Sequence, residues 1–142
     1  MFEWCLLLAS GFYGYFFSVL VLPFHQYFMI SGVILFILGL GVHGLSHKEH
    51  KQAHSKAEDI KRIITTGIYS KIRHPGYLGL ILMYTGMAFW FYSLIPVIIA
   101  IIFTVLHVLT ALKEEEYLLR KFEEKYSEYM KRVPWRFIPK VF

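Results

Sequence analysis

Residues 4–47 read WCLLLASGFYGYFFSVLVLPFHQYFMISGVILFILGLGVHGLSH, a stretch of 44 residues without Asp, Glu, Lys or Arg. A second uncharged stretch of 39 residues covers positions 74–112. Because a membrane-spanning helix needs ~20 apolar residues, each stretch is long enough for two spans. Pro23 and its polar neighbours divide the first stretch, and residues 92–96 divide the second. The sequence therefore predicts an all-α polytopic membrane protein with four transmembrane helices, at about 4–22, 27–45, 76–92 and 95–112. A tight hairpin is an alternative arrangement for the last two.

The composition of the whole chain agrees with this class. The 142 residues are 56% hydrophobic and 18% charged, whereas ordinary soluble domains are about 45–50% apolar and about 25% charged. A water-facing surface cannot be built from uncharged stretches of this length, which excludes a usual soluble globular enzyme. The apolar content also excludes a disordered chain. We expect a single membrane domain over residues 1–142.

The basic residues are confined to two segments. Seven of the 15 Lys and Arg residues lie in the loop 46–75, and eight lie in the tail 113–142. With four spans, both segments fall on one side of the membrane, and the positive-inside rule makes that side cytoplasmic. We therefore expect an integral protein of the cell membrane or the endoplasmic reticulum membrane, with both termini and the active site in the cytoplasm. The basic residues alternate with acidic ones beside the spans, which favours contact with lipid headgroups over nucleic acid.

Four histidines near the end of the second span are candidates for metal binding. His43, His47, His50 and His54 are spaced four, three and four residues apart, so a continuing helix would carry them on one face. A metal-dependent membrane oxidoreductase is one interpretation. The other is a polar helix extension at the level of the headgroups. One straight helix cannot surround a metal ion, so we assign no metal ligands from the sequence.

The densest polar segment beside a span is TTGIYSKIRHPGY at 65–77. Gly67 can adopt a positive φ, and Pro75 suits the first turn of the third span. Arg73 and His74 then lie at a helix N-terminus, where backbone N–H groups and a guanidinium can bind a carboxylate or a phosphate. An anchoring loop that binds lipid headgroups is the alternative interpretation.

The tail contributes acidic groups and an amphipathic helix on the same side of the membrane. Glu114, Glu115 and Glu116 directly follow the last span. A ligand with both positive charge and a carboxylate, such as S-adenosylmethionine, could bridge these residues and Arg73. Residues 113–133 predict an amphipathic helix that ends before Pro134. Its apolar face would be formed by Leu118, Phe122, Tyr126, Tyr129 and Val133.

Two of these segments together carry a family resemblance. GIYSKIRHPGYLG at 67–79 and EEEYLLRKFEEKYSEYMKRVPWRFIP at 114–139, separated by a pair of spans, resemble the isoprenylcysteine carboxyl methyltransferase and phospholipid methyltransferase family. Its members are integral-membrane enzymes that use S-adenosylmethionine. From the position of the two motifs on one side of the membrane, we expect Arg73 to orient a carboxylate of donor or acceptor, with Glu115 as a second polar candidate for the catalytic site. The resemblance implies a cofactor site formed by Lys61, Ile64, Tyr69, His74, Pro75, Gly76, Tyr77 and Glu114.

The resemblance leaves the methyl acceptor open. Carboxyl methyltransferases of the family have an arginine where this sequence has Thr110. A phospholipid amine and an isoprenylcysteine carboxylate, free or on a prenylated protein, both remain candidates. No residue is assigned as a catalytic base. The alternative functions are a non-catalytic membrane scaffold, the metal-dependent oxidoreductase and, as a more distant option, a nicotinamide-dependent reductase. A related family of membrane reductases shares the general fold.

Overall fold

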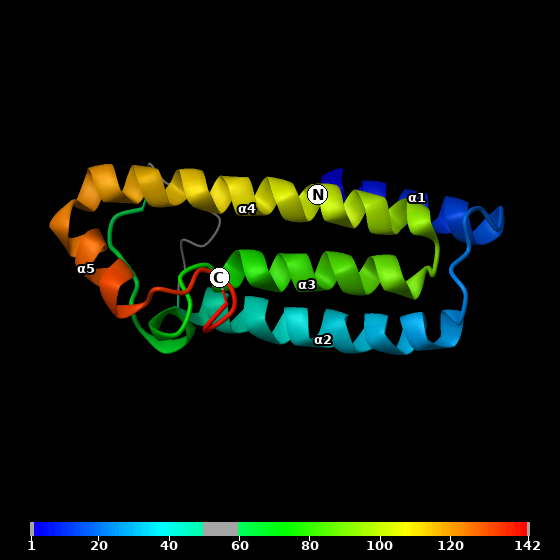
Figure 1. Ribbon diagram of the computed structural model, residues 1–142, viewed down its shortest axis with the longest axis horizontal. Coiled ribbons are helices and arrows are strands. Elements are labelled where there is room, and N and C mark those ends of the chain that lie inside the picture. Colours follow the sequence, from blue (N-terminus) through cyan, green and yellow to red (C-terminus); the bar gives the residue numbers. More distant parts are fainter. Residues whose placement is uncertain (1, 50–59, 142) are drawn as a thin grey trace. The chain divides into compact units, whose positions relative to one another are not determined.

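The computed structural model describes residues 2–49 and 60–141, and over these residues it is helical (Figure 1). No strand occurs in these two ranges, where the sole β-type pairing is an isolated bridge between Val21 and Ser93. The prediction of an all-α protein is therefore confirmed for the described part of the chain. The helices are α1 (Phe2–Phe16), α2 (His25–Glu49), α3 (Pro75–Trp90), α4 (Leu94–Phe122) and α5 (Glu124–Arg132), with a 3-10 turn, η2 (Gly67–Ser70), before α3.

Two of the helices are long and apolar enough to cross a membrane. The mean hydropathy of their most apolar segments is 2.2 for α2 and 2.6 for α4, and only 11% and 22% of those segments are buried. Such exposed apolar surface would not be stable in water, so these are not the buried core helices of a soluble protein. The 15 residues of α1 and the 16 of α3 fall short of a full span. Four spans and the predicted cytoplasmic side stay predictions.

The first helix ends earlier than the predicted span. The first predicted span reaches residue 22, but α1 ends at Phe16. Ser18 and Leu20 take φ values of 51° and 50°, which a right-handed helix cannot contain. The helix of the second predicted span continues past residue 45 to Glu49, as the interpretation of the histidine face requires.

By their internal contacts the residues form two compact units. The first unit comprises Met1–Leu40 and Gly79–His107, and the second comprises Gly41–Leu78 and Val108–Phe142. The expected single membrane domain stays a prediction. The first unit has a small core in which five side chains are buried: Leu7, Tyr84, Ala88, Ala100 and Phe103.

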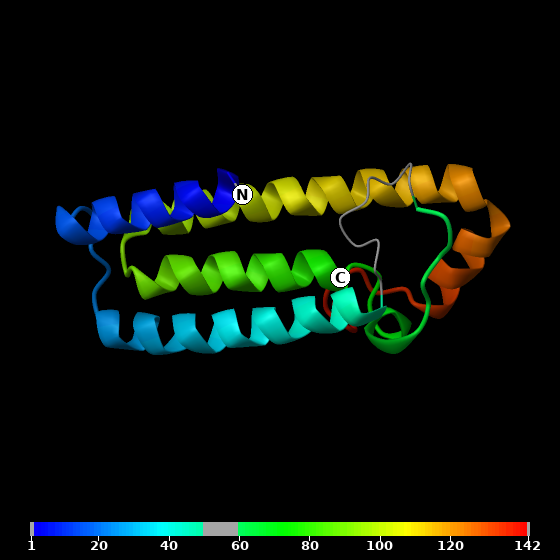
Figure 2. The same cartoon turned by 180° about the vertical axis from the view of Figure 1, so that it is seen from behind.

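Glycines bring α2 and α3 together inside the first unit, where the two helices run side by side in both views (Figure 1, Figure 2). A Cβ atom added to Gly32 would lie 2.6 Å from the carbonyl oxygen of Gly86, and one added to Gly86 would lie 2.6 Å from that of Gly32. Small residues at such positions allow helix backbones to approach closely. Gly32 therefore has a packing role between the two helices, whereas Gly44 has open space around it.

In the second unit the predicted amphipathic helix is present but interrupted. Residues 113–122 continue α4, and Glu123, with a φ of 45°, separates them from α5. The prediction of one continuous helix over 113–133 is therefore wrong, because the positive φ ends the helical hydrogen bonding. The apolar face was predicted correctly. Four side chains of this face are buried together with Ile60 in a second core: Leu118, Tyr126, Tyr129 and Val133. Phe122 is partly buried and packs against this core.

Candidate functional site

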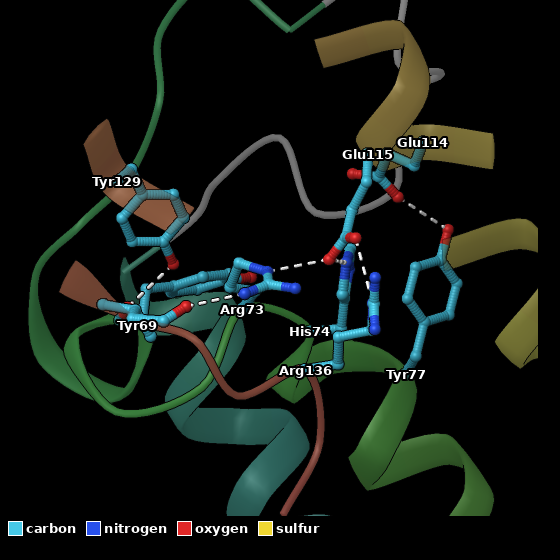
Figure 3. A network of polar contacts seen from close by, with 9 residues as sticks. Tyr69, Arg73, His74, Tyr77, Glu114, Glu115, Tyr129 and Arg136 are labelled. Atoms are coloured by element: carbon cyan, nitrogen blue, oxygen red, sulfur yellow. Dashed lines mark hydrogen bonds and ion pairs between the residues drawn. The ribbon is translucent and has the colours of Figure 1, made fainter. Parts of the chain in front are cut away.

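The centre of the site is the carboxylate of Glu115, in the charged extension of α4. Its Oε1 accepts hydrogen bonds from Arg73 Nε at 2.7 Å and from His74 Nε2 at 3.0 Å, and its Oε2 accepts one from Arg136 Nε at 3.0 Å (Figure 3). The side chains of Arg73 and Glu115 are only 3% and 5% exposed. One buried carboxylate therefore holds together the loop before α3, the end of α4 and the C-terminal tail.

Backbone hydrogen bonds fix the loop and the tail in the same place. The N–H groups of Arg73 and His74 donate to the carbonyl oxygens of Trp135 and Arg136, both at 2.9 Å. Arg73 Nη1 also donates to the carbonyl of Val133 at 2.7 Å. The loop must leave helical geometry here, because Pro75 is the first residue of α3, as predicted. Carbonyl groups of the tail thus accept hydrogen bonds from the N–H groups of Arg73 and His74, which have no acceptor within α3.

The surroundings of Glu115 keep it ionised. Burial alone would raise the pKa of this carboxyl, but the hydrogen bonds and positive charges of His74 and Arg73 lower it to about 2. Glu115 lies beyond the uncharged stretch, which ends at residue 112. At neutral pH the site therefore contains a buried, ionised carboxylate that is paired with a guanidinium.

The carboxylate expected at Arg73 and His74 is thus one that the protein itself provides. The sequence predicts that these residues can bind the carboxylate or phosphate of a ligand. In the structure, Glu115 occupies that position by direct contact, and the nearby N–H groups are bound by carbonyls of the tail. The positive charge of Arg73 is therefore balanced within the protein, without a lipid headgroup.

Glu114 belongs to a neighbouring contact in the same unit. The hydroxyl group of Tyr77 donates to Glu114 Oε2 at 3.0 Å. Unlike Glu115, the Glu114 side chain is only half-buried, and so is Tyr77. This carboxylate is therefore more accessible than that of Glu115 and can accept further hydrogen bonds from a ligand.

Tyr69 is held by two contacts in η2. Its hydroxyl group lies 2.7 Å from Ser46 Oγ, and its carbonyl oxygen accepts a hydrogen bond from the hydroxyl of Tyr129 at 2.8 Å. Burial raises the pKa of the Tyr69 hydroxyl, so it stays protonated at neutral pH. Gly67 begins this turn with the expected positive φ, at 58°.

The predicted site residues fall into three groups. The structure brings six of them into the contacts described above, from the loop, η2, α3 and α4: Tyr69, Arg73, His74, Tyr77, Glu114 and Glu115 (Figure 3). Pro75 and Gly76 are the first two residues of α3. The hydrogen bonds above do not include Lys61, which is exposed, or Ile64, which is half-buried, and both lie in the irregular segment before η2. The cofactor-binding role of each residue stays a prediction.

Sequence reasoning did not find three members of the network. Arg136 lies between Trp135 and Phe137, a pattern typical of a membrane-interface anchor. Tyr129 was assigned to an apolar helix face, without a partner for its hydroxyl group. Ser46 could have been noticed as the polar residue that lies between His43 and His47 at the end of the apolar stretch.

The face of four histidines is described only in part. The Nε2 atoms of His43 and His47 are 3.0 Å apart, and His43 Nδ1 lies 3.2 Å from the carbonyl oxygen of Gly76. His50 and His54 lie outside the described residues. Within residues 2–49 and 60–141, no group of three or more His, Cys, Asp or Glu side chains could hold a metal ion.

Most residues of this network lie within a segment that matches a known family. The model of the phospholipid methyltransferase family matches residues 27–125. The chain is also 32% identical, over 84 residues, to a Delta(14)-sterol reductase of Mus musculus, which covers 58% of this chain and 20% of that protein. It is 34% identical, over 83 residues, to a probable 7-dehydrocholesterol reductase of Acanthamoeba polyphaga mimivirus, covering 57% of this chain and 19% of that protein. The chain thus spans about a fifth of the length of these curated relatives.

Proposed function

Because the chain belongs to the phospholipid methyltransferase family, we propose that it transfers a methyl group from S-adenosylmethionine to a lipidic acceptor at the membrane surface. The acceptor is a phospholipid amine or an isoprenylcysteine carboxylate. One observation carries the proposal. Two segments that are far apart in sequence, both within the matched residues 27–125, meet where His74 lies 3.0 Å from Glu115 and Tyr77 lies 3.0 Å from Glu114.

The residues present suit S-adenosylmethionine. The cofactor has a positively charged ammonium group, a positively charged sulfonium and two ribose hydroxyl groups. A carboxylate attracts the positive charges and accepts hydrogen bonds from the ammonium and the hydroxyl groups. Glu114 provides a half-buried carboxylate, oriented by the hydroxyl of Tyr77. Tyr69 adds a protonated hydroxyl group close to Ser46. We assign the binding of the cofactor to Glu114, Tyr77 and Tyr69, with His74, Pro75 and Gly76 shaping the start of α3 and Lys61 and Ile64 as further candidates.

Arg73 and Glu115 position the site instead of touching the acceptor. Each is nearly buried, and each is bound by the other. Arg73 additionally fixes the tail through the carbonyl of Val133. Their effect on catalysis would then be indirect, since they hold the loop and α4 so that Tyr77 and Glu114 face each other. This replaces the direct contact with a substrate carboxylate that the sequence suggests for Arg73.

For methyl transfer, the protein mainly has to align the donor and the acceptor. When bound, S-adenosylmethionine supplies an electrophilic methyl group on its sulfonium. In-line displacement requires that the acceptor atom and the methyl carbon be aligned and that water be excluded. The ion network around Glu115 gives a rigid support for this alignment. A carboxylate acceptor needs no base, whereas an amine acceptor must first lose a proton.

A membrane location of this site is part of the proposal. Helix α4 runs without a break from the apolar stretch into the charged residues that carry Glu114 and Glu115. A lipid could therefore reach the site from the membrane, and a water-soluble cofactor could reach it from the side of the charged segments. We propose that four segments cross the membrane and that the site faces the cytoplasm, as the positive-inside rule predicts.

Direct binding of the product, S-adenosylhomocysteine, tests the proposal. Calorimetry on the full chain, purified in detergent, should detect binding, and labelled S-adenosylmethionine should transfer its methyl group to membrane lipids or to a prenylcysteine analogue. Tyr77→Phe removes only the hydroxyl that contacts Glu114 and should weaken binding. Tyr27→Phe, at an exposed tyrosine of α2, is the matched control. No binding to well-folded protein would contradict the proposal.

A second candidate function is the reduction of a lipid double bond. It is favoured by the identity of 30–34% to proteins named as sterol reductases, over more than half of this chain. A reductase needs a hydride donor such as a nicotinamide cofactor. The same calorimetric experiment with NADPH separates the two functions. Binding of NADPH without S-adenosylhomocysteine would favour reduction, and a scaffold would bind neither.

A further inference from the structure

We propose that the hydroxyl group of Tyr126 binds the carboxylate at the amino-acid end of the S-adenosyl cofactor. Tyr126 belongs to α5, and its side chain lies in the second core, where the residue is 2% exposed. Within the part of the chain that the structure describes, no group forms a hydrogen bond with this hydroxyl, and its oxygen is not fully enclosed. The inference rests on the proposed function and adds a residue to its cofactor site.

A hydroxyl without a partner is unusual in so buried a residue. Buried polar groups are nearly always hydrogen-bonded, because burying an unbonded hydroxyl costs free energy. The neighbouring Tyr129 shows the ordinary case, since it is 3% exposed and its hydroxyl donates to the carbonyl oxygen of Tyr69 at 2.8 Å. The ring centroids of the two tyrosines are 5.8 Å apart. The hydroxyl of Tyr126 therefore suits a partner that arrives with a ligand.

Tyr126 packs beside the part of α4 that carries the carboxylates of the candidate site. It shares a core with Leu118, which lies about one helical turn after Glu114 and Glu115 on α4. The charges of Glu115, Arg73 and Glu114 all act on its hydroxyl. These residues belong to the same compact unit. A ligand that binds to Glu114 therefore has the hydroxyl of Tyr126 nearby.

The chemistry of the hydroxyl selects the carboxylate of the cofactor. Burial raises the pKa of the Tyr126 hydroxyl, so it keeps its proton at neutral pH and can donate a hydrogen bond. The amino-acid end of the cofactor carries an ammonium and a carboxylate on one carbon atom. Glu114 suits the ammonium, and the carboxylate beside it then needs a donor close by. The guanidinium of Arg73 is already paired with Glu115, whereas Tyr126 supplies such a donor.

Two ligands that differ only by the carboxylate test the inference, by calorimetry on the full chain in detergent. S-adenosylhomocysteine has the carboxylate, whereas its decarboxylated analogue lacks it but keeps the ammonium and the ribose. Wild type should bind S-adenosylhomocysteine about 10- to 100-fold more tightly than the analogue, as expected for a hydrogen bond to a charged group. Tyr126→Phe should remove this preference, by weakening the binding of S-adenosylhomocysteine and leaving that of the analogue unchanged.

The outcomes separate this inference from the proposed function. If wild type binds S-adenosylhomocysteine and Tyr126→Phe binds it equally well, the inference is overturned and the proposed function stands. Equal weakening of both ligands by Tyr126→Phe also overturns the inference, because the hydroxyl would then not recognise the carboxylate. If well-folded wild type binds neither ligand, the proposed function and the inference both fail.

Thermal unfolding without ligand excludes a purely structural role of the hydroxyl. Tyr126→Phe should unfold at the same temperature as wild type or at a higher one, because its hydroxyl loses no partner within the protein. Tyr129→Phe is the matched control and should unfold at a lower temperature, because the carbonyl of Tyr69 loses its donor. A lowered unfolding temperature of Tyr126→Phe would overturn the inference, since the hydroxyl would then stabilise the fold itself.

Discussion

Arg73 and Glu115, 42 positions apart in the chain, are joined by a 2.7 Å hydrogen-bonded ion pair that is almost completely shielded from solvent. The pair connects the segment before α3 with the charged end of α4. A buried pair of this kind adds little net stability compared with apolar residues, but removing one partner leaves a buried charge uncompensated. The effect of substitution at either residue should therefore be large.

We expect Glu115→Gln to destabilise the protein by about 3–5 kcal/mol, because Arg73 would keep its charge in a buried position without its partner. Thermal or denaturant unfolding in detergent measures this. The matched control is Glu116→Gln, at the exposed neighbouring residue, which should change stability by less than about 0.5 kcal/mol. Equal effects of the two substitutions would show that the ion pair does not support the fold.

The same carboxylate predicts a pH dependence of stability. The pKa of Glu115 is about 2 in the folded protein, against 4.5 for an ordinary glutamate. A lowered pKa in the folded state means that the stabilisation is fully present above pH 4.5 and is lost as the pH falls toward 2. The stability advantage of the wild type over Glu115→Gln should therefore shrink by on the order of 2 kcal/mol between pH 4.5 and about pH 3.

The comparison with Glu115→Gln isolates this residue from the other carboxyl groups, which titrate alike in both proteins. Unfolding is measured for the two proteins at each pH, in the same detergent. A difference in stability that stays constant from pH 6 to about pH 3 would contradict the lowered pKa.

The close approach of α2 and α3 gives a prediction about packing. Gly32→Ala places a methyl group 2.6 Å from the carbonyl oxygen of Gly86 and 2.8 Å from the amide nitrogen of Trp90. Backbone atoms cannot move away without separating the helices, so we expect a loss of about 1–3 kcal/mol. Gly44→Ala in the same helix meets nothing within 4 Å and should be neutral or slightly stabilising, because alanine favours helices. Unfolding in detergent compares the two variants, and similar stabilities would exclude tight packing at Gly32.

Local patterns in the sequence predicted what depends on local physics. The lack of charge over residues 4–47 and 74–112 indicated apolar helices, and Pro75 and Gly67 marked the start of α3 and a positive φ. The spacing of apolar residues identified the face that carries Leu118 and Tyr126. Each of these features is decided by neighbours within a few positions.

Features that depend on distant residues were not predictable in this way. Ser18 and Glu123 take positive φ values although neither is a glycine, so the short α1 and the break before α5 were missed. The pairing of Arg73 with Glu115 joins residues that only tertiary structure brings together. The sequence showed a site for a carboxylate and a group of carboxylates, but not that the protein satisfies one with the other.

We expect Glu114 to have a ligand-binding role and Glu115 to have a structural role. We expect Glu114→Gln to weaken binding of S-adenosylhomocysteine by about 10- to 100-fold, the effect of removing a charged partner from a hydrogen bond worth about 1.5–3 kcal/mol. Its unfolding temperature should change little, because Glu114 is half-buried and its described hydrogen bond is to Tyr77. Glu115→Gln should instead mainly lower the unfolding temperature of the protein. Calorimetric affinity and thermal unfolding, measured side by side with Glu116→Gln as the control, distinguish the two roles. If Glu114→Gln binds the product as tightly as wild type, Glu114 is not a cofactor ligand and the proposed cofactor site must be revised.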